Sequence, residues 1–175
     1  EYYKNIETNT MSNAFSNCTS LVSITLKFEL YYEDMSYLFM GCSSLESINT
    51  LFSDFFYFPF TKYMNGMFID CHSLDHVALL EYGFTAHYLI DISYMFSGSS
   101  VTFVNLFEIN TSNIKNYKGL FYNCPHLSSI DLSTFTHNNL SDSELSIFKG
   151  VYPYYSTLIV NEEFLKRIKV PSNFF

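Results

Sequence analysis

The sequence contains no tryptophan, only 4 prolines and few charged residues, which make up 15% of its 175 positions. Lys and Arg total 9 against 17 Asp and Glu, so the formal net charge is −8. An acidic chain is repelled by phosphate backbones, which disfavours a nucleic-acid partner. No stretch reaches the roughly 18 apolar residues that span a bilayer, so we expect no transmembrane segment within the chain.

Signatures of catalysis are also missing. The chain has no G-x-S-x-G elbow, no phosphate-binding loop and no H-E-x-x-H motif. Ser, His and Asp are plentiful, but without a placed nucleophile and base they do not make a site. No basic segment precedes an apolar run after Glu1, so we expect no signal peptide and interpret the chain as an excised or processed piece. We predict a protein that is not an enzyme and carries no cofactor.

The sequence does contain a repeated motif, M-x-x-Φ-F-x-x-C-x-S-L-x-x-I-x-L, in which Φ is apolar. Its marker phenylalanines recur with a period typical of stacked repeats, at Phe15, Phe39, Phe68, Phe96, Phe121 and Phe148. Five of the 6 glycines lie two residues from a marker, so the repeat places them. We predict one domain of six repeats with a C-terminal cap: 10–34, 35–62, 63–91, 92–115, 116–141, 142–160 and the cap 161–175.

Each copy combines two periodicities. Its first half has apolar residues at i, i+3, i+4 and i+7, the spacing of one helix face, as in Met11, Ala14, Phe15 and Cys18. Asp34 and Asp91 precede their copies at a helix N-cap position, and Ile24 and Leu26 alternate as in a strand. We therefore predict an α/β repeat solenoid. It would be a leucine-rich-repeat-like right-handed coil with short strands forming a parallel sheet on one face and short helices on the other. Asn161 is expected to cap a closing helix.

The motif resembles the BspA-like leucine-rich repeats of microbial surface proteins. The segments Gly41–Ile48 and Asn123–Leu132 carry the resemblance, and Thr157–Val160 followed by a helix is similar to that family's closing segment. The resemblance implies an extracellular or cell-surface protein that binds host or neighbouring macromolecules. The return loops depart from the family because they vary in length and are unusually aromatic.

The four cysteines occupy one column of the repeat, at Cys18, Cys42, Cys71 and Cys124. Stacked side chains point in parallel, whereas a disulfide needs opposed Cβ vectors, so we predict free buried thiols. Zinc is bound by such residue types, and His72 and His76 lie near Cys71, as His126 lies near Cys124. The repeat directs those side chains apart, so we predict no metal site.

The outward positions of the predicted strands form one candidate ligand face. Its members are Ser23, Thr25, Ser47, Asn49, His76, Phe103, Asn105, Ser129 and Asp131, with Thr157 and Ile159 continuing the two columns. The face is small, polar and nearly uncharged, which suits a glycan or a flat protein surface. The alternative is a plain solvated sheet.

Aromatic return loops form the other candidate surface. They contain Tyr31, Tyr32, Phe55, Phe56, Tyr57, Phe58, Phe60, Tyr82 and Phe84. Exposed aromatic side chains mark interfaces, whereas a thin coil also needs bulky residues to fill its interior. We expect about half of them to point inward. Asn110 and Asn139 are candidate glycosylation sites in N-x-S triplets.

Two functions remain open. The first is an extracellular recognition or adhesion module that binds a protein or glycan through the strand face or the aromatic loops. The second is a structural coat or scaffold component that packs against itself, as a homo-oligomer, or against fixed neighbours. A third, an intracellular scaffold, is allowed by the reduced cysteines.

Overall fold

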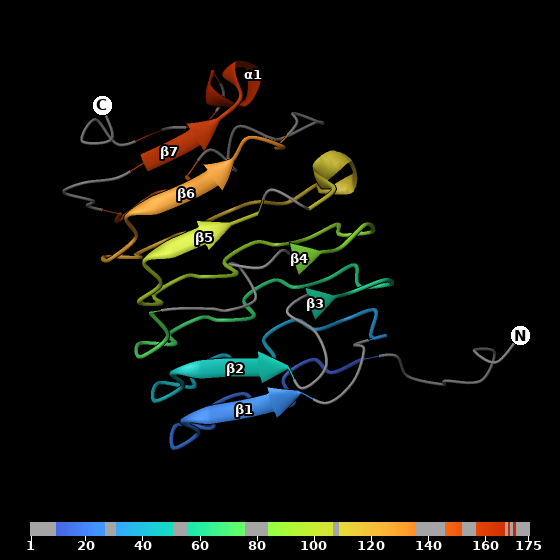
Figure 1. Ribbon diagram of the computed structural model, residues 1–175, viewed down its shortest axis with the longest axis vertical. Coiled ribbons are helices and arrows are strands. Elements are labelled where there is room, and N and C mark those ends of the chain that lie inside the picture. Colours follow the sequence, from blue (N-terminus) through green and yellow to red (C-terminus); the bar gives the residue numbers. More distant parts are fainter. Residues whose placement is uncertain are drawn as a thin grey trace, which may run out of the picture.

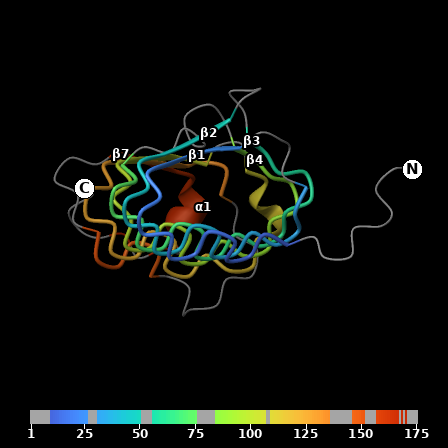
Figure 2. The same ribbon diagram turned by 90° about the horizontal axis from the view of Figure 1, so that it is seen from below.

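The structure, a computed structural model, describes residues 10–26, 31–50, 56–75, 84–106, 109–135, 146–151, 157–166, 168 and 170. Successive similar coils stack along the long axis, from β1 at one end to β7 and α1 at the other (Figure 1). Viewed along the stack, the strands lie on one wall and turn segments on the opposite wall (Figure 2). No helix in this described part has the length and apolar character needed to cross a bilayer.

The strand wall is built from parallel pairs. β1 (Ser23–Leu26) pairs with β2 (Ser47–Thr50). A three-stranded sheet contains β5 (Phe103–Asn105), β6 (Ser129–Leu132) and β7 (Thr157–Val160). The return segments contribute a third sheet that the repeat pattern did not predict, in which β3 (Phe56–Tyr57) pairs with β4 (Phe84–Thr85). The predicted parallel sheets are therefore present.

The helices predicted for the opposite wall are wrong, because its backbone forms hydrogen-bonded turns. In the first coil, the Phe15 N–H donates to the carbonyl oxygen of Leu38 in the next coil at 2.9 Å, whereas the Cys18 N–H donates back to Phe15 at 3.2 Å. The same alternation of donors recurs in the next four coils. An α-helix directs its donors along its own axis. The turn wall instead bonds every coil to its neighbour.

The physical reason is a pair of left-handed residues in each of the first five coils and one such residue in the sixth. The Phe−2 column, two residues before the marker, comprises Asn13, Tyr37, Gly66, Tyr94 and Gly119. The Phe+2 column, two residues after it, comprises Asn17, Gly41, Asp70, Gly98, Asn123 and Gly150. Their φ angles lie between 54° and 81°, which interrupts a right-handed helix. Most are Gly, Asn or Asp, which adopt this conformation at least cost. Apolar residues four apart still face inward, so the burial was predicted correctly and the backbone was not.

Glycines alternate with larger residues throughout the Phe+2 column, and from Tyr37 onward in the Phe−2 column, because neighbouring coils approach closely. A Cβ on Gly98 would lie 2.3 Å from Oδ1 of Asp70, and a Cβ on Gly66 would lie 2.5 Å from the Tyr37 ring. Each of these glycines therefore makes room for a side chain of the preceding coil. This explains why five glycines lie two residues from a marker phenylalanine.

The interior is organised around the marker phenylalanines. Their rings stack along the axis with centroids 5.5 to 6.0 Å apart and planes within 18° of parallel. From Phe39 to Phe148 these rings are fully buried, whereas Phe15 in the first coil is only partly buried. The aromatic column is thus covered on both sides except at its first member.

Asp34 and Asp91 cap turns and not helices. Their Oδ1 atoms accept the N–H groups of Ser36 and Ser93, each at 2.8 Å. Both aspartates also form parallel bridges to Tyr63 in the coil that lies between them. The predicted capping chemistry is present, but it begins a turn.

The last coil is followed by α1 (Glu162–Leu165), the closing helix that the sequence predicted. Asn161 caps it as expected, since its side chain accepts the Phe164 N–H at 2.8 Å. The buried Phe164 ring packs edge-on against Phe135 at 5.4 Å and Tyr117 at 6.0 Å. These contacts close one end of the stack.

Candidate functional site

The described part of the strand face has the register that the repeat predicted. Ser23 lies opposite Ser47 and Thr25 opposite Asn49. In the other sheet, Phe103, Ser129 and Thr157 form one column, and Asn105, Asp131 and Ile159 form the next. His76, between the two sheets in sequence, lies outside the described residues.

Exposure differs along this face. Thr25 and Asn49 are exposed, whereas Asn105 and Asp131 are half-buried. Ile159, at the far edge, is 48% exposed. Asp131 is the one charged member of the described columns, and its Oδ1 accepts the Ser133 N–H at 2.9 Å. The buried residues between the columns hold these side chains on a fixed backbone.

Hydroxyl groups beside the strands donate hydrogen bonds to backbone carbonyls of the preceding coil. Ser128 Oγ donates to the carbonyl of Thr102 at 2.9 Å, and Thr102 Oγ1 donates to the carbonyl of Asp75 at 3.0 Å. These bonds join successive coils at the edge of the strand wall. The outward column residues are therefore better candidates for ligand contact than their neighbours.

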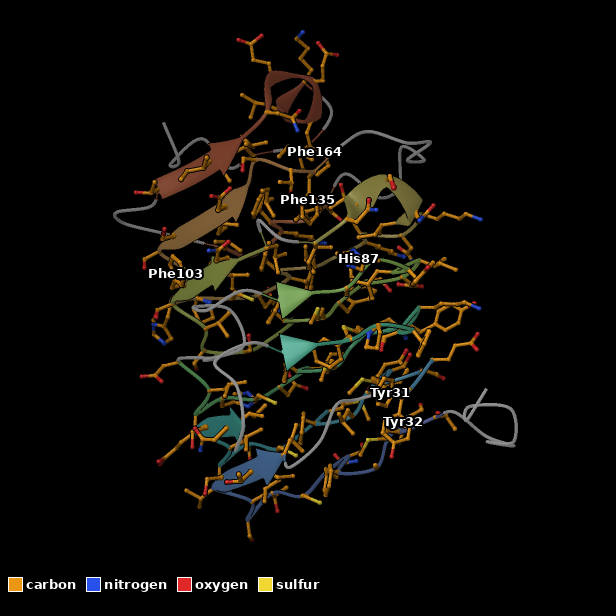
Figure 3. The ribbon with its side chains drawn as sticks, turned by 45° about the vertical axis from the view of Figure 1, so that its right-hand side comes forward. Tyr31, Tyr32, His87, Phe103, Phe135 and Phe164 are labelled. Atoms are coloured by element: carbon orange, nitrogen blue, oxygen red, sulfur yellow. The ribbon has the colours of Figure 1, made fainter. Side chains whose placement is uncertain are left out.

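A partly exposed aromatic column lies away from β1 and β2, on the side of the stack where Figure 3 labels Tyr31 and Tyr32. The bridges Asp34–Tyr63 and Tyr63–Asp91, with the β3–β4 register, place Tyr31, Phe60 and Tyr88 at equivalent positions of three coils. The Tyr31 and Phe60 rings are 5.9 Å apart. Phe60 is 47% and Tyr88 54% exposed. We call Tyr31, Phe60 and Tyr88 the aromatic ridge.

The remaining predicted aromatic residues divide into three groups. Phe58 is fully buried, so its assignment to an interface is wrong, and Tyr32 packs partly buried against the core. The structure describes only the backbone of Phe56, Tyr57 and Phe84, which lie in β3 and β4. Two candidates, Phe55 and Tyr82, lie outside the described residues.

Tyr88, the most exposed member of the ridge, lies in one of the aromatic loops, but the sequence analysis did not align it with Tyr31 and Phe60. The loops differ in length between coils, so the repeat motif alone does not align Tyr31, Phe60 and Tyr88. Counting backwards from the residue that precedes each motif, at Asp34, Tyr63 and Asp91, aligns them, since each ridge residue lies three positions earlier. This was the available signal.

The cysteine column is free and mostly buried, as predicted, although Cys18 is exposed. The thiols of Cys71 and Cys124 donate to the marker carbonyls of the preceding coil, Phe39 at 3.2 Å and Phe96 at 2.9 Å. Burial raises the pKa of each of these two thiols to about 12. Neutral thiols that act as hydrogen-bond donors are poor nucleophiles and poor metal ligands.

The side chains of the candidate zinc ligands that the structure describes beside one another, Cys71 and His72, point in different directions. Cys71 points into the core, while the exposed His72 ring contacts the carbonyl of Asp70 at 2.7 Å. Among the residues described here, no three His, Cys, Asp or Glu side chains are grouped to hold a metal ion.

The glycosylation candidate Asn110 is exposed and begins a short 3-10 helix, η2 (Thr111–Asn113). Its Oδ1 accepts the N–H of Ser112 at 3.1 Å and the hydroxyl of the same residue at 2.6 Å. Modification of Asn110 stays a prediction. Asn139 lies outside the described residues.

Comparison with known proteins places the repeats in a family. A family model described as "Mycoplasma protein of unknown function, DUF285" matches residues 33–155, the region that holds five of the six marker phenylalanines. No curated protein and no solved structure matches the chain. Because the matched region covers more than half of the sequence, the protein belongs to this DUF285 family.

Proposed function

We propose that the protein is a recognition or adhesion module, a right-handed solenoid of the leucine-rich-repeat type that binds a protein or glycan. The observation that carries the proposal is the aromatic ridge, in which Phe60 and Tyr88 expose about half of their surface on adjacent coils. Tyr and Phe are enriched where proteins meet their partners, and a contiguous exposed apolar surface marks such a site. The resemblance of the motif to BspA-like repeats supports an extracellular or cell-surface location.

The strand face is the second surface of the same module. Thr25 and Asn49 offer short polar side chains on a fixed backbone, with two strands in register. Such a face can donate and accept hydrogen bonds without the entropy cost of ordering long side chains. The strand face would bind the polar part of a ligand whose apolar part contacts the ridge. Alternatively, it would bind a separate ligand.

Capture of partners from the native source, identified by mass spectrometry, tests the proposal with three forms of the protein. These are the wild type, the ridge variant Phe60→Ser with Tyr88→Ser, and the strand-face variant Asn49→Arg with Asn105→Arg. Since Phe60 and Tyr88 are exposed, the ridge variant should keep the thermal midpoint while losing the partner. Equal recovery by all three forms would contradict binding at both surfaces.

A structural coat is the alternative that the same ridge favours. An apolar ridge on a chain with 15% charged residues also suits packing against further copies or fixed neighbours. Sedimentation of the purified protein separates the two functions. Assembly that disappears in the Phe60→Ser, Tyr88→Ser variant supports the coat, whereas a monomer that captures a foreign protein or glycoconjugate supports recognition.

A further inference from the structure

The aromatic ridge is one of two outward columns that run side by side along four adjacent coils. Backbone bonds define the second column, because the N–H groups of Lys62, Ile90 and Lys115 each donate at 2.8 Å to the carbonyl of the equivalent residue one coil earlier. We call this second set the flanking column, namely Glu33, Lys62, Ile90 and Lys115. Each member lies two positions after a residue of the ridge column, namely Tyr31, Phe60, Tyr88 and, in the last of these coils, Asn113. The residue between them points inward, as the complete burial of Leu89 and Ile114 shows, so both columns face outward together.

The two ends of the flanking column carry opposite charges. Glu33 is exposed at one end and Lys115 is exposed at the other. Lys62 contacts Oε1 of Glu33 at 2.9 Å, and no described residue bonds to Oε2 of that carboxylate or forms an ion pair with Lys115. Between these ends the ridge column exposes about half of Phe60 and of Tyr88. The surface therefore has an aromatic centre between a carboxylate oxygen at one end and an ammonium group at the other.

We infer that the ridge binds a second copy of the protein, related by a two-fold axis that passes between the coil of Phe60 and the coil of Tyr88. An axis that lies in the interface and crosses the stack reverses the order of the coils but keeps each column opposite itself. Phe60 then meets Tyr88 of the second copy, and each such contact occurs twice. In the same way Glu33 meets Lys115 of the second copy.

This pairing rests on the proposed function, because it takes the ridge as the binding surface and names its partner. A two-fold pair is closed, so it gives a dimer and not the extended assembly of a coat. The strand face of each copy is not part of the pairing.

Charge selects this register among the alternatives. An axis through the coil of Lys62 would oppose that ammonium to itself, and an axis through the coil of Ile90 would oppose Lys62 to Lys115. Like charges at close range repel each other. An axis parallel to the stack would set Glu33 against either itself or the ridge. An axis between the coils of Glu33 and Lys62 matches opposite charges, but it moves Lys115 out of contact with every described coil.

Two charge reversals test the pairing in the full chain, because each should weaken the dimer alone and the two should restore it together. In the Glu33→Lys variant the introduced lysine meets Lys115 of the second copy. In the Lys115→Glu variant the introduced glutamate meets Glu33. A 1:1 mixture of the two variants opposes a carboxylate to an ammonium at both contacts. The matched controls are Glu46→Lys and Lys118→Glu, which make the same charge changes at exposed positions outside both columns.

Sedimentation velocity over a concentration series measures the dissociation constants. We expect the wild type and the mixture to dimerise with similar constants, and each reversal alone to dimerise about tenfold or more weakly. The controls should match the wild type, both alone and mixed. High salt should narrow the difference between the reversals and the wild type, because it screens exposed charges.

A wild type that stays monomeric up to its solubility limit would overturn the inference. So would a mixture that dimerises no more tightly than its two components, or a Lys115→Glu variant that dimerises as the wild type does. Capture of a foreign partner through the ridge by a monomeric protein would overturn the inference and leave the proposed function standing. A dimer with the expected charge pattern supports the inference even where no foreign partner is captured.

Discussion

Replacement of Gly98 by alanine tests the reason for the turn wall. Gly98 has a φ of +69°, and an added Cβ would lie 2.3 Å from Oδ1 of Asp70. A non-glycine residue in this conformation costs roughly 1–2 kcal/mol, and the reduced freedom of the unfolded chain returns about 0.4–1 kcal/mol. Because Asp70 is exposed and its carboxylate can move, crowding adds only about 1 kcal/mol, the low end for overpacking.

The free energy of unfolding should therefore fall by about 2 kcal/mol, which lowers the thermal midpoint by roughly 4–8 °C in a protein of this length. Scanning calorimetry with denaturant titration measures both. The double variant Gly98→Ala, Asp70→Gly should recover the crowding cost of about 1 kcal/mol and keep the backbone cost. Ser97→Ala, next to the site but without a positive φ, should change stability by less than about 0.5 kcal/mol.

An unaltered midpoint in Gly98→Ala would refute the reasoning. It would mean that the residue two positions after the marker does not adopt a left-handed conformation. The helix that the apolar spacing predicts would then be the better description of that wall. If the double variant is no more stable than the single one, the close approach of neighbouring coils is wrong.

Three further predictions concern the interior. Alkylation at pH 8 should modify Cys18 and spare Cys71 and Cys124 until the protein unfolds, since burial raises the pKa of both to about 12; rapid modification of all three in folded protein would contradict the packing. In the folded protein the pKa values of both thiols exceed the ordinary 9.0, so their contribution to the free energy of unfolding is complete below about pH 9 and is lost as the pH rises toward 12. Denaturation at stepped pH measures this loss. Phe68→Ala should destabilise the protein by about 3–5 kcal/mol and Phe15→Ala by clearly less, because Phe68 is fully buried between two rings and Phe15 is not; equal losses in urea titration would count against an open first coil.

The sequence by itself determined the repeat, the buried positions and the strand register. The marker phenylalanine and the residue before it are apolar in every copy, and the residue four positions before the marker is apolar in five of the six. That spacing decides which side chains face the interior whatever the backbone does. Alternation at Ile24 and Leu26 correctly predicted a strand, because one side of a short strand must face the core.

Only the tertiary structure decided the form of the turn wall and the surface of the aromatic loops. An α-helix and the turns of this wall both place the residues at i, i+3, i+4 and i+7 on one side. Which of the two forms depends on whether the backbone N–H groups donate within a coil or to the neighbouring coil. Left-handed residues such as Asn17 and Gly41 bond the coils together, an advantage that exists only once a neighbour is in place. In the same way, Phe58 and Phe60 are equally apolar in the sequence. The stack buries one and exposes the other, because loop direction is set by neighbouring coils and not by local pattern.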